Sequence, residues 1–268
     1  MNAPDVTIGV VSWNARDQLL ACLDALPAAL AGLSAQTVVV DNGSTDGTWP
    51  LLERRADVDA ICNDRNVGLT PGRNQILARS RGRALLMLDS DTRPLPGSVR
   101  TLVEYLDAHP RVGLAGAMLL DPDGTLQLSC RTFPPLLLPF MRRPPLAAVF
   151  EHRRTVNFHL MRDYDHARPR AVDWVMGACQ CTRGDLARSL GGYDERIFSH
   201  GGEDTDWCVR TWKAGYEVHY VPGARVIHDY GHFTRRNPLS KQALRGLVDY
   251  FYMQAKHRDA RSGLARPR

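Results

Sequence analysis

Two carboxylates one residue apart, Asp89 and Asp91, directly follow an apolar run at residues 84–88. Such a run predicts a short strand buried on both faces, as in the middle of a parallel sheet. The carboxyl ends of these strands lie at the sheet edge where open α/β folds bind ligands. Two carboxylates there repel each other unless a cation lies between them, and their hard oxygen atoms suit Mg²⁺ or Mn²⁺ together with a substrate's phosphates. An acidic turn before Pro94 and Pro96 is the alternative that these residues leave open.

A second acidic pair, Glu203 and Asp204, follows two glycines and precedes a stretch with helical spacing. The spacing over residues 205–214 predicts a helix, so both acids lie at its N-terminus. Carboxylates often cap a helix at this position, because they accept hydrogen bonds from its free backbone N–H groups. Capping and a catalytic role are both open for this pair.

Buried strands must position these acids, and the first half of the chain supplies them at regular intervals. Residues 6–12 and 37–41 are rich in β-branched apolar side chains, and 60–63 is a shorter candidate strand. Helical spacing of apolar residues is found in the segments 14–26, 46–52, 71–79 and 98–109. A further strand is predicted over 112–120. This alternation predicts an α/β fold with a mostly parallel sheet covered on both sides. The first strand–helix junction, 12–17, has no glycine, which excludes a Rossmann dinucleotide site.

The second half of the chain is less regular. Residues 121–170 contain many prolines and no periodic pattern, so we expect a long loop there. This loop is either a surface insertion or a flap over an acceptor site that contacts lipid. Short strands are expected in 172–182, 217–221 and 224–227. A final helix over 241–257 is predicted to bury Leu244, Leu247, Val248, Phe251 and Tyr252.

Composition describes an ordinary globular chain of 268 residues, 44% of them hydrophobic, with a formal charge of +5. Arginine is preferred to lysine, which suits phosphate recognition. A basic C-terminal end is either solvated or in contact with a membrane surface. Six cysteines without a C-x-x-C pair indicate a reducing compartment, and from the sequence we expect neither a signal peptide nor a membrane-spanning segment. We therefore expect a cytoplasmic protein, possible peripheral contact with the inner membrane face, and no nucleic-acid partner.

The motifs occur in an order that resembles the GT-A glycosyltransferases of family 2, and within them the rhamnosyltransferase-like branch. They are Val10-Val-Ser12-Trp-Asn14, Val38-Val-Val-Asp41-Asn-Gly-Ser44, Asn66-Val-Gly68, Arg73-Asn74, Leu88-Asp89-Ser-Asp91, Gly202-Glu203-Asp204-Thr-Asp-Trp207 and His228. The resemblance implies a mostly parallel central sheet flanked by helices, with a smaller C-terminal acceptor-side part. It also implies one GT-A domain over 1–268, with a nucleotide-sugar-binding half (1–120), an acceptor-side half (121–236) and a C-terminal helix with a basic tail (237–268).

The resemblance assigns the nucleotide-sugar donor to the first half of the chain. The residues that it places around the base, ribose and phosphates are Ser12, Asn14, Asp41, Gly68, Arg73, Asp89, Arg235 and Arg236. From its chemistry, the Asp41 carboxylate is compatible with uracil or thymine, because it can accept a hydrogen bond from the ring N3–H. The branch suggests dTDP-rhamnose, a UDP-sugar is also favoured, and a guanine nucleotide remains open.

The resemblance likewise assigns the metal and the catalytic base. Asp91 and Asp89 hold Mn²⁺ or Mg²⁺ with His228, while Asp204, with Glu203 beside it, deprotonates the acceptor hydroxyl. The result is an inverting transferase, because one base opposite the leaving group gives a single displacement. The acceptor is a glycan, a lipid-linked sugar or a small molecule, and the oligomeric state is open. The alternative is a non-catalytic nucleotide-sugar-binding protein of the same fold.

Overall fold

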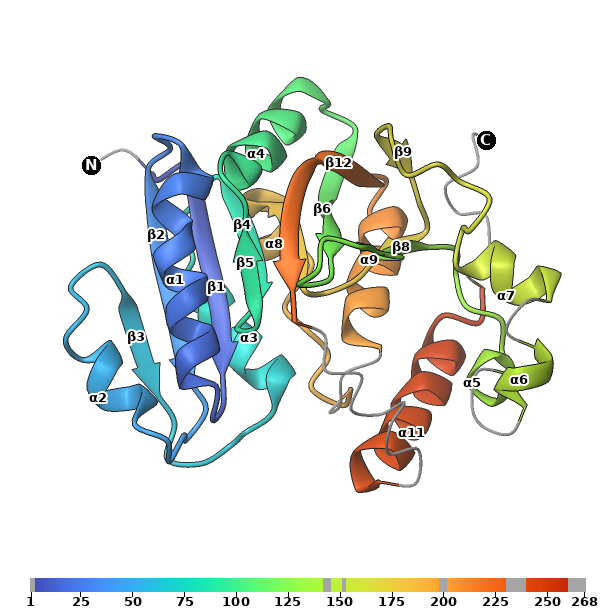
Figure 1. The fold of residues 1–268 in the computed structure, drawn as a ribbon, viewed down its shortest axis with the longest axis horizontal. Coiled ribbons are helices and arrows are strands. Elements are labelled where there is room, and N and C mark those ends of the chain that lie inside the picture. The colour runs from blue at the N-terminus through green and yellow to red at the C-terminus, as the bar shows by residue number, and fades with distance from the viewer. Residues whose placement is uncertain (1–2, 142–145, 151–152, 198–201, 230–239, 260–268) are drawn as a thin grey trace.

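The computed structural model describes residues 3–141, 146–150, 153–197, 202–229 and 240–259 (Figure 1). Most of its strands form one large mixed sheet, and two short strands, at 130–131 and 174–175, form a separate antiparallel pair. The elements of the first half are β1 (Val6–Ser12), α1 (Arg16–Leu30), β2 (Ala35–Asp41), α2 (Thr48–Leu52), β3 (Asp59–Cys62), α3 (Leu69–Arg79) and β4 (Ala84–Asp89). Strands β3, β2, β1 and β4 lie side by side and are parallel, as their apolar sequences predict. The pairing of β1 with β2 ends at Ser12 opposite Asp41, so both strand ends reach one edge of the sheet.

Alternating residues of these strands pack on opposite faces of the sheet. Ile8, Val10 and Leu86 face one layer, which α1 and α4 cover, whereas Val38 and Met87 face a second layer that includes α3 and α9. Period-2 alternation therefore gives each strand two buried faces. This accounts for the nearly continuous apolar sequences and confirms the prediction of a sheet covered on both sides.

The sheet continues with strands from the second half of the chain. Its elements are β5 (Thr92–Pro94), α4 (Ser98–Ala108), β6 (Val112–Leu120), β11 (Cys179–Arg183), α8 (Gly184–Ser189), α9 (Glu203–Lys213) and β12 (Glu217–His228). The order is β3-β2-β1-β4-β11-β6-β12-β5, in which β11 runs antiparallel between β4 and β6. The two strands expected in 217–221 and 224–227 form one strand, β12, whose pairing with β6 has an irregularity between Val221 and Arg225.

The prediction of a long structureless loop over 121–170 is wrong for the described residues. That part of the chain and the residues directly after it form β7 (Leu126–Gln127), β8 (Cys130–Arg131), α5 (Leu138–Met141), α6 (Ala147–Phe150), α7 (Arg154–His159), β9 (Arg170–Ala171) and β10 (Trp174–Val175). Each element is too short to show a periodic pattern in the sequence. Leu138, Val156 and Leu160 pack together and give these helices a small core of their own.

The C-terminal helix α11 (Lys241–Lys256) packs through a face that matches the predicted one only in part, since Phe251 is partly buried against the core. Leu244 is 49% exposed and Val248 is 64% exposed, whereas Tyr250 and Met253 are buried against Phe133 and Val209 of α9. Apolar residues occur on both faces of α11, so periodicity alone does not select the inner one. None of the described helices is long and apolar enough to cross a membrane.

A buried carboxylate selects the packed face of α11. Asp206 of α9 is 1% exposed and accepts hydrogen bonds from His257 Nε2 (2.7 Å) and Arg210 Nε (2.8 Å), and it forms an ion pair with Lys256 Nζ (2.6 Å). Burial alone would raise the pKa of Asp206, but the hydrogen bond from His257 and the charges of Arg210 and Lys256 outweigh it and lower the pKa. This cluster fixes α11 against the helix that carries Glu203 and Asp204.

We expect Asp206→Asn to lower the free energy of unfolding by about 3 kcal/mol, because it leaves the partly buried Arg210 and Lys256 and the buried His257 without their carboxylate. Urea unfolding followed by circular dichroism measures the change. Asp259→Asn is the matched control, since Asp259 also pairs with a lysine, Lys213, but is 67% exposed. The control should leave stability nearly unchanged. Equal stabilities of Asp206→Asn and the parent protein would contradict the role given to this cluster.

Candidate active site

Asp89, Asp91 and His228 come together at the carboxyl edge of the sheet. Asp89 ends β4, Asp91 follows it, and His228 ends β12, which folds back along β5 so that His228 pairs with Thr92. The Asp229 N–H also donates to the Asp91 carbonyl oxygen (3.0 Å). One potential ligand atom from each of the three residues lies within 4.8 Å of the others. The described residues can therefore hold a metal ion here, as the sequence predicted for this set.

The electrostatics of this group favour a bound cation. Burial and the nearby charge of Asp89 raise the pKa of Asp91 to about 6, against the opposing effect of His228. The Asp91 carboxylate is 30% exposed, so it remains open to a ligand from solvent. A divalent cation between the two carboxylates would offset their repulsion.

The orientation of His228 is set by Gln127, a residue that the sequence gave no reason to select. The Gln127 amide Nε2 donates to Asp121 Oδ1 (2.6 Å) and to the His228 carbonyl oxygen (2.8 Å). Both partners are acceptors, so the amide oxygen must face His228 Nδ1, 2.9 Å away, and Nδ1 carries a proton. In the neutral imidazole, Nε2 then presents its lone pair on the side of Asp91, 3.6 Å away. Metal-binding histidines are commonly oriented in this way.

Arg73 of α3 joins the Asp89 side of the site to the second acidic pair. Its side chain is 2% exposed, and Nη2 donates to Asp89 Oδ1 (3.0 Å) and to the Gly177 carbonyl oxygen (3.2 Å). Nη1 lies 3.5 Å from Glu203 Oε1. The sequence predicted that Arg73 and Glu203 belong to the site, and the structure brings them together as a buried ion pair.

Asp204 lies on the other side of Gly177, at the start of α9. Its Oδ2 accepts a hydrogen bond from the Gly177 N–H (3.0 Å), and its Oδ1 accepts one from the Thr205 N–H (2.7 Å). Burial and the charge of Glu203 raise the pKa of Asp204 to about 7, although both amides and Arg73 oppose the shift. A Cβ on Gly177 would lie 3.1 Å from Asp204 Cβ and 3.2 Å from Arg73 Nη2, which leaves little room for any larger residue.

The residues predicted around the nucleotide base lie at the ends of β1 and β2. Ser12 is 1% exposed and Asp41 is 0% exposed, and Ser12 Oγ and Asp41 Oδ2 lack hydrogen-bond partners among the described residues. Asn14, at φ 49°, follows β1, and its Oδ1 accepts a hydrogen bond from the N–H of Thr45, which follows β2 (2.8 Å). Asn14 thus joins the segment after β1 to the segment after β2, beside the buried Asp41.

Gly68 is held by a side chain that the sequence analysis did not select. Asn42 follows β2, is 2% exposed, and donates from Nδ2 to the Gly68 carbonyl oxygen (3.0 Å). Its Oδ1 accepts from the Val67 N–H (3.2 Å). Gly68 precedes α3 at φ 102°, a conformation that favours glycine. Arg235 and Arg236, predicted to contact phosphate, lie outside the described residues.

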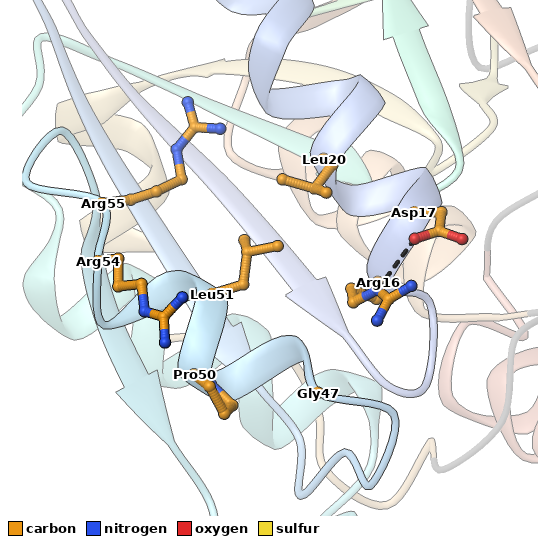
Figure 2. A pocket seen from close by; sticks show the side chains of 8 residues that line it. All are labelled: Arg16, Asp17, Leu20, Gly47, Pro50, Leu51, Arg54 and Arg55. Atoms are coloured by element: carbon orange, nitrogen blue, oxygen red, sulfur yellow. Dashed lines mark hydrogen bonds and ion pairs between the residues drawn. The ribbon is translucent and has the colours of Figure 1, made fainter.

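A separate pocket lies between α1 and α2 (Figure 2) and does not include the predicted site residues. It is lined by Arg16, Asp17, Leu20, Gly47, Pro50, Leu51, Arg54 and Arg55. Arg16 forms an ion pair with Asp17, and Arg55 forms ion pairs with Asp24 and Asp57. These carboxylates neutralise much of the basic character of the pocket, so we do not assign the active site to it.

The sequence matches known protein families over most of its length. Residues 7–165 match the family described as glycosyl transferase family 2, and residues 161–236 match one described as the N-terminal domain of galactosyltransferase. An N-acetylglucosaminyl-diphospho-decaprenol L-rhamnosyltransferase of Mycobacterium tuberculosis is 30% identical over 254 residues, which cover 85% of this chain and 79% of that protein. The rhamnosyltransferase WbbL of Escherichia coli is 39% identical over 71 residues, or 26% of each chain.

Solved structures share the fold at lower sequence identity. A structure of GalNAc-T7 with UDP, GalNAc and Mn²⁺ matches with a TM-score of 0.62 and 15% identity, over 96% of this chain and 51% of that one. A mannosyltransferase from Pyrobaculum calidifontis with GDP-Man and Mn²⁺ matches with a TM-score of 0.56 and 18% identity, over 99% and 78%. These likenesses confirm the predicted GT-A fold, a central, mostly parallel sheet flanked by helices.

We expect Gln127→Leu to weaken Mn²⁺ binding by about 10–100-fold, because it removes the acceptor that orients His228. Isothermal titration of the protein with Mn²⁺ measures the affinity, and the melting temperature shows whether the variant is folded. Gln18→Leu makes the same substitution at an exposed position of α1 and should bind Mn²⁺ like the parent protein. A folded Gln127→Leu variant with parental affinity would show that the amide does not orient the imidazole.

Proposed function

The chain belongs to glycosyl transferase family 2, and from this premise we propose that it transfers a sugar, with inversion, from a nucleoside-diphosphate sugar to an acceptor hydroxyl. One observation carries the assignment of roles. A buried guanidinium, Arg73, links the potential metal ligand Asp89 to the pair Glu203 and Asp204. Arg73 thus connects Asp89, which suits a metal ion on the leaving diphosphate, to Asp204, which suits the attacking hydroxyl.

Asp89, Asp91 and His228 fit a divalent metal ion, which we propose to be Mn²⁺ or Mg²⁺. Carboxylates suit both ions, and the imidazole favours Mn²⁺, since Mg²⁺ prefers oxygen ligands throughout. When bound, such an ion stabilises the negative charge that grows on a diphosphate leaving group. The protein's own contribution is orientation, because Gln127 fixes the His228 ring and Arg73 holds Asp89.

Asp204 is the proposed general base. Its two amide hydrogen bonds hold the carboxylate in place, and a pKa of about 7 suits a group that must take up a proton near neutral pH. A base opposite the leaving group gives a single displacement and therefore inversion of the anomeric centre. Glu203 is 5% exposed and faces Arg73, so we assign it the role of a positioning residue that adjusts the pKa of Asp204.

The buried end of β2 supports a pyrimidine nucleotide as donor. Asp41 Oδ1 accepts from the Ser44 N–H (3.1 Å), whereas Oδ2 has no partner among the described residues. A buried acceptor without a donor destabilises the protein, and the ring N3–H of uracil or thymine supplies one. Guanine N1–H is a donor of the same kind, so our preference for dTDP-rhamnose or a UDP-sugar rests on the rhamnosyltransferase relatives.

The acceptor that we propose is a sugar linked through diphosphate to a polyprenol. The relative with 30% identity is named for such an acceptor, and its alignment covers 79% of that protein. Arg73 is buried and cannot contact the acceptor directly. On this proposal the acceptor hydroxyl approaches Asp204 at the start of α9.

We expect Asp204→Asn to lower the rate of transfer by about 10²–10⁴-fold, because the positioned base is lost. Release of nucleoside diphosphate measures the rate, and the anomeric coupling in the NMR spectrum of the product reports inversion. Nucleotide binding, followed by the melting temperature with Mn²⁺, should survive the substitution. Unchanged turnover would reject Asp204 as the base, and turnover absent from the parent protein with every donor would favour a non-catalytic binding protein.

The pH dependence of kcat/KM provides a second test of Asp204 as the general base. In the parent protein, kcat/KM should fall about tenfold per pH unit below pH 7, because protonated Asp204 cannot accept a proton. Glu203→Gln removes a charge that raises the pKa of Asp204, so the midpoint of the profile should move to lower pH. A profile that does not move would show that Glu203 has no electrostatic effect on the base.

We expect Asp41→Asn to weaken binding of dTDP and UDP by about tenfold or more. When the new amide nitrogen occupies the position of Oδ2, two hydrogen-bond donors, the amide and the ring N3–H, face each other. Thermal shifts over a nucleotide concentration series measure the affinities of dTDP, UDP and GDP. Asp57→Asn, an exposed position after α2, is the matched control and should leave all three unchanged. Equal loss of GDP and dTDP binding would contradict recognition of a pyrimidine ring.

A further inference from the structure

The helices α5, α6, α7 and α11 and the segments beside them expose large apolar side chains. The exposed residues in this region are Leu136, Leu137, Phe140, Leu146, Val149, Phe158, Leu244 and Val248. Their exposed fractions run from 44% at Phe140 to 64% at Val248. Single exposed apolar residues are normal on a protein surface, but a contiguous group marks a site of interaction.

The helices that carry these residues lie together in space (Figure 1). The ring of Phe140 in α5 lies 6.0 Å from that of Phe251 in α11, and Gln254 Nε2 of α11 donates to the Pro134 carbonyl oxygen (2.7 Å). Leu138 of α5 packs with Val156 of α7. These contacts pack α5 against α7 and α11, and we call the exposed apolar residues of these helices and of the segments beside them the apolar surface.

Basic residues predominate on the helices that carry the apolar surface. Lys241, Leu244, Arg245 and Val248 recur at helical spacing and form one exposed face of α11. Arg154 is exposed at the start of α7. Among the described residues of α5, α6, α7 and α11 the sole carboxylate is Asp249, which is 2% exposed. Asp163 and Asp165 are exposed in the segment that follows α7.

The same helix that exposes this surface also contacts the proposed catalytic region. Gly202 directly precedes Glu203, and a Cβ placed on it would lie 3.7 Å from both the Asp249 carbonyl oxygen and Met253 Cβ of α11. Lys256 and His257 bind Asp206 two residues after Asp204. The inner face of α11 thus supports the beginning of α9, while its outer face is apolar and basic.

We propose that the apolar surface docks the protein onto an anionic lipid bilayer. A helix with apolar residues and lysine or arginine on its outward face lies in the interface of a membrane, where apolar burial and attraction to anionic headgroups act together. A protein partner of ordinary composition would meet the basic residues with acids, but an anionic bilayer offers both a hydrocarbon interior and negative charge. The inference rests on the proposed function to the extent that a polyprenol-linked acceptor is itself held in a membrane.

The test is sedimentation with vesicles in the absence of donor and metal. The parent protein should sediment with vesicles of phosphatidylcholine containing about one third phosphatidylglycerol, and less with phosphatidylcholine alone or at high salt. The double variant Leu244→Asp, Val248→Asp should lose binding by at least about tenfold, because both side chains leave the bilayer interior. Leu126→Asp, an exposed leucine on β7, makes the same kind of change outside the apolar surface and should bind like the parent protein.

Two results would overturn the proposal. One is a parent protein that sediments with neither kind of vesicle. The other is a folded double variant, verified by its melting temperature, that binds vesicles like the parent. Light scattering during size-exclusion chromatography identifies self-association, and a parental dimer that the double variant abolishes, without vesicle binding, would assign the surface to a second copy of the chain. Since the assay contains no donor, vesicle binding without transfer rejects the proposed function alone, and transfer to a soluble acceptor without vesicle binding rejects the docking surface alone.

Discussion

The buried charge of Arg73 is the constraint on which the site depends. A guanidinium that is 2% exposed destabilises a fold unless anionic and polar partners surround it, and here Asp89, Glu203 and the Gly177 carbonyl oxygen do so. These partners belong to β4, to α9 and to the segment before β11. Because separating any of them from Arg73 exposes a buried charge to an apolar interior, the positions of Asp89 and of α9 are fixed relative to each other.

The reversed strand β11 makes this arrangement possible. It runs antiparallel to β4, so Cys179 at its start pairs with Leu88 near the end of β4. The Asp89 N–H donates to the Ala178 carbonyl oxygen (3.1 Å), which brings Gly177 to the same edge of the sheet. Gly177 can then accept from Arg73 and donate to Asp204. In an all-parallel sheet the strand next to β4 would start at the opposite edge of the sheet. The residue before that strand could then not lie between Arg73 and Asp204, as Gly177 does.

The sequence predicted the parts of the fold that repeat a pattern. Buried strands ending in Ser12, Asp41 and Asp89 were recognisable from continuous apolar residues, and the acids at their ends followed from the direction of a parallel sheet. Gln127 and Gly177 were not recognisable, because each acts through a single contact in a segment without periodicity. The buried face of α11 was predicted correctly for Phe251 but not for Leu244 and Val248. Both faces of the helix carry apolar residues, and the long-range partner Asp206 decides between them.

The two faces of α11 have different physical origins, and this bears on how the proposed acceptor reaches the site. Its inner face is held by a buried cluster around Asp206, so the helix cannot turn to bury Leu244 and Val248 without breaking His257 and Lys256 away from that carboxylate. The cluster around Asp206 therefore holds α11 in an orientation that leaves the apolar residues Leu244 and Val248 exposed to water, which is unfavourable in solution. An anionic bilayer removes that cost, and it does so on the helix that supports the proposed base. On our proposal, a polyprenol-linked sugar therefore approaches Asp204 from the membrane side, while the nucleotide binds at the ends of β1 and β2.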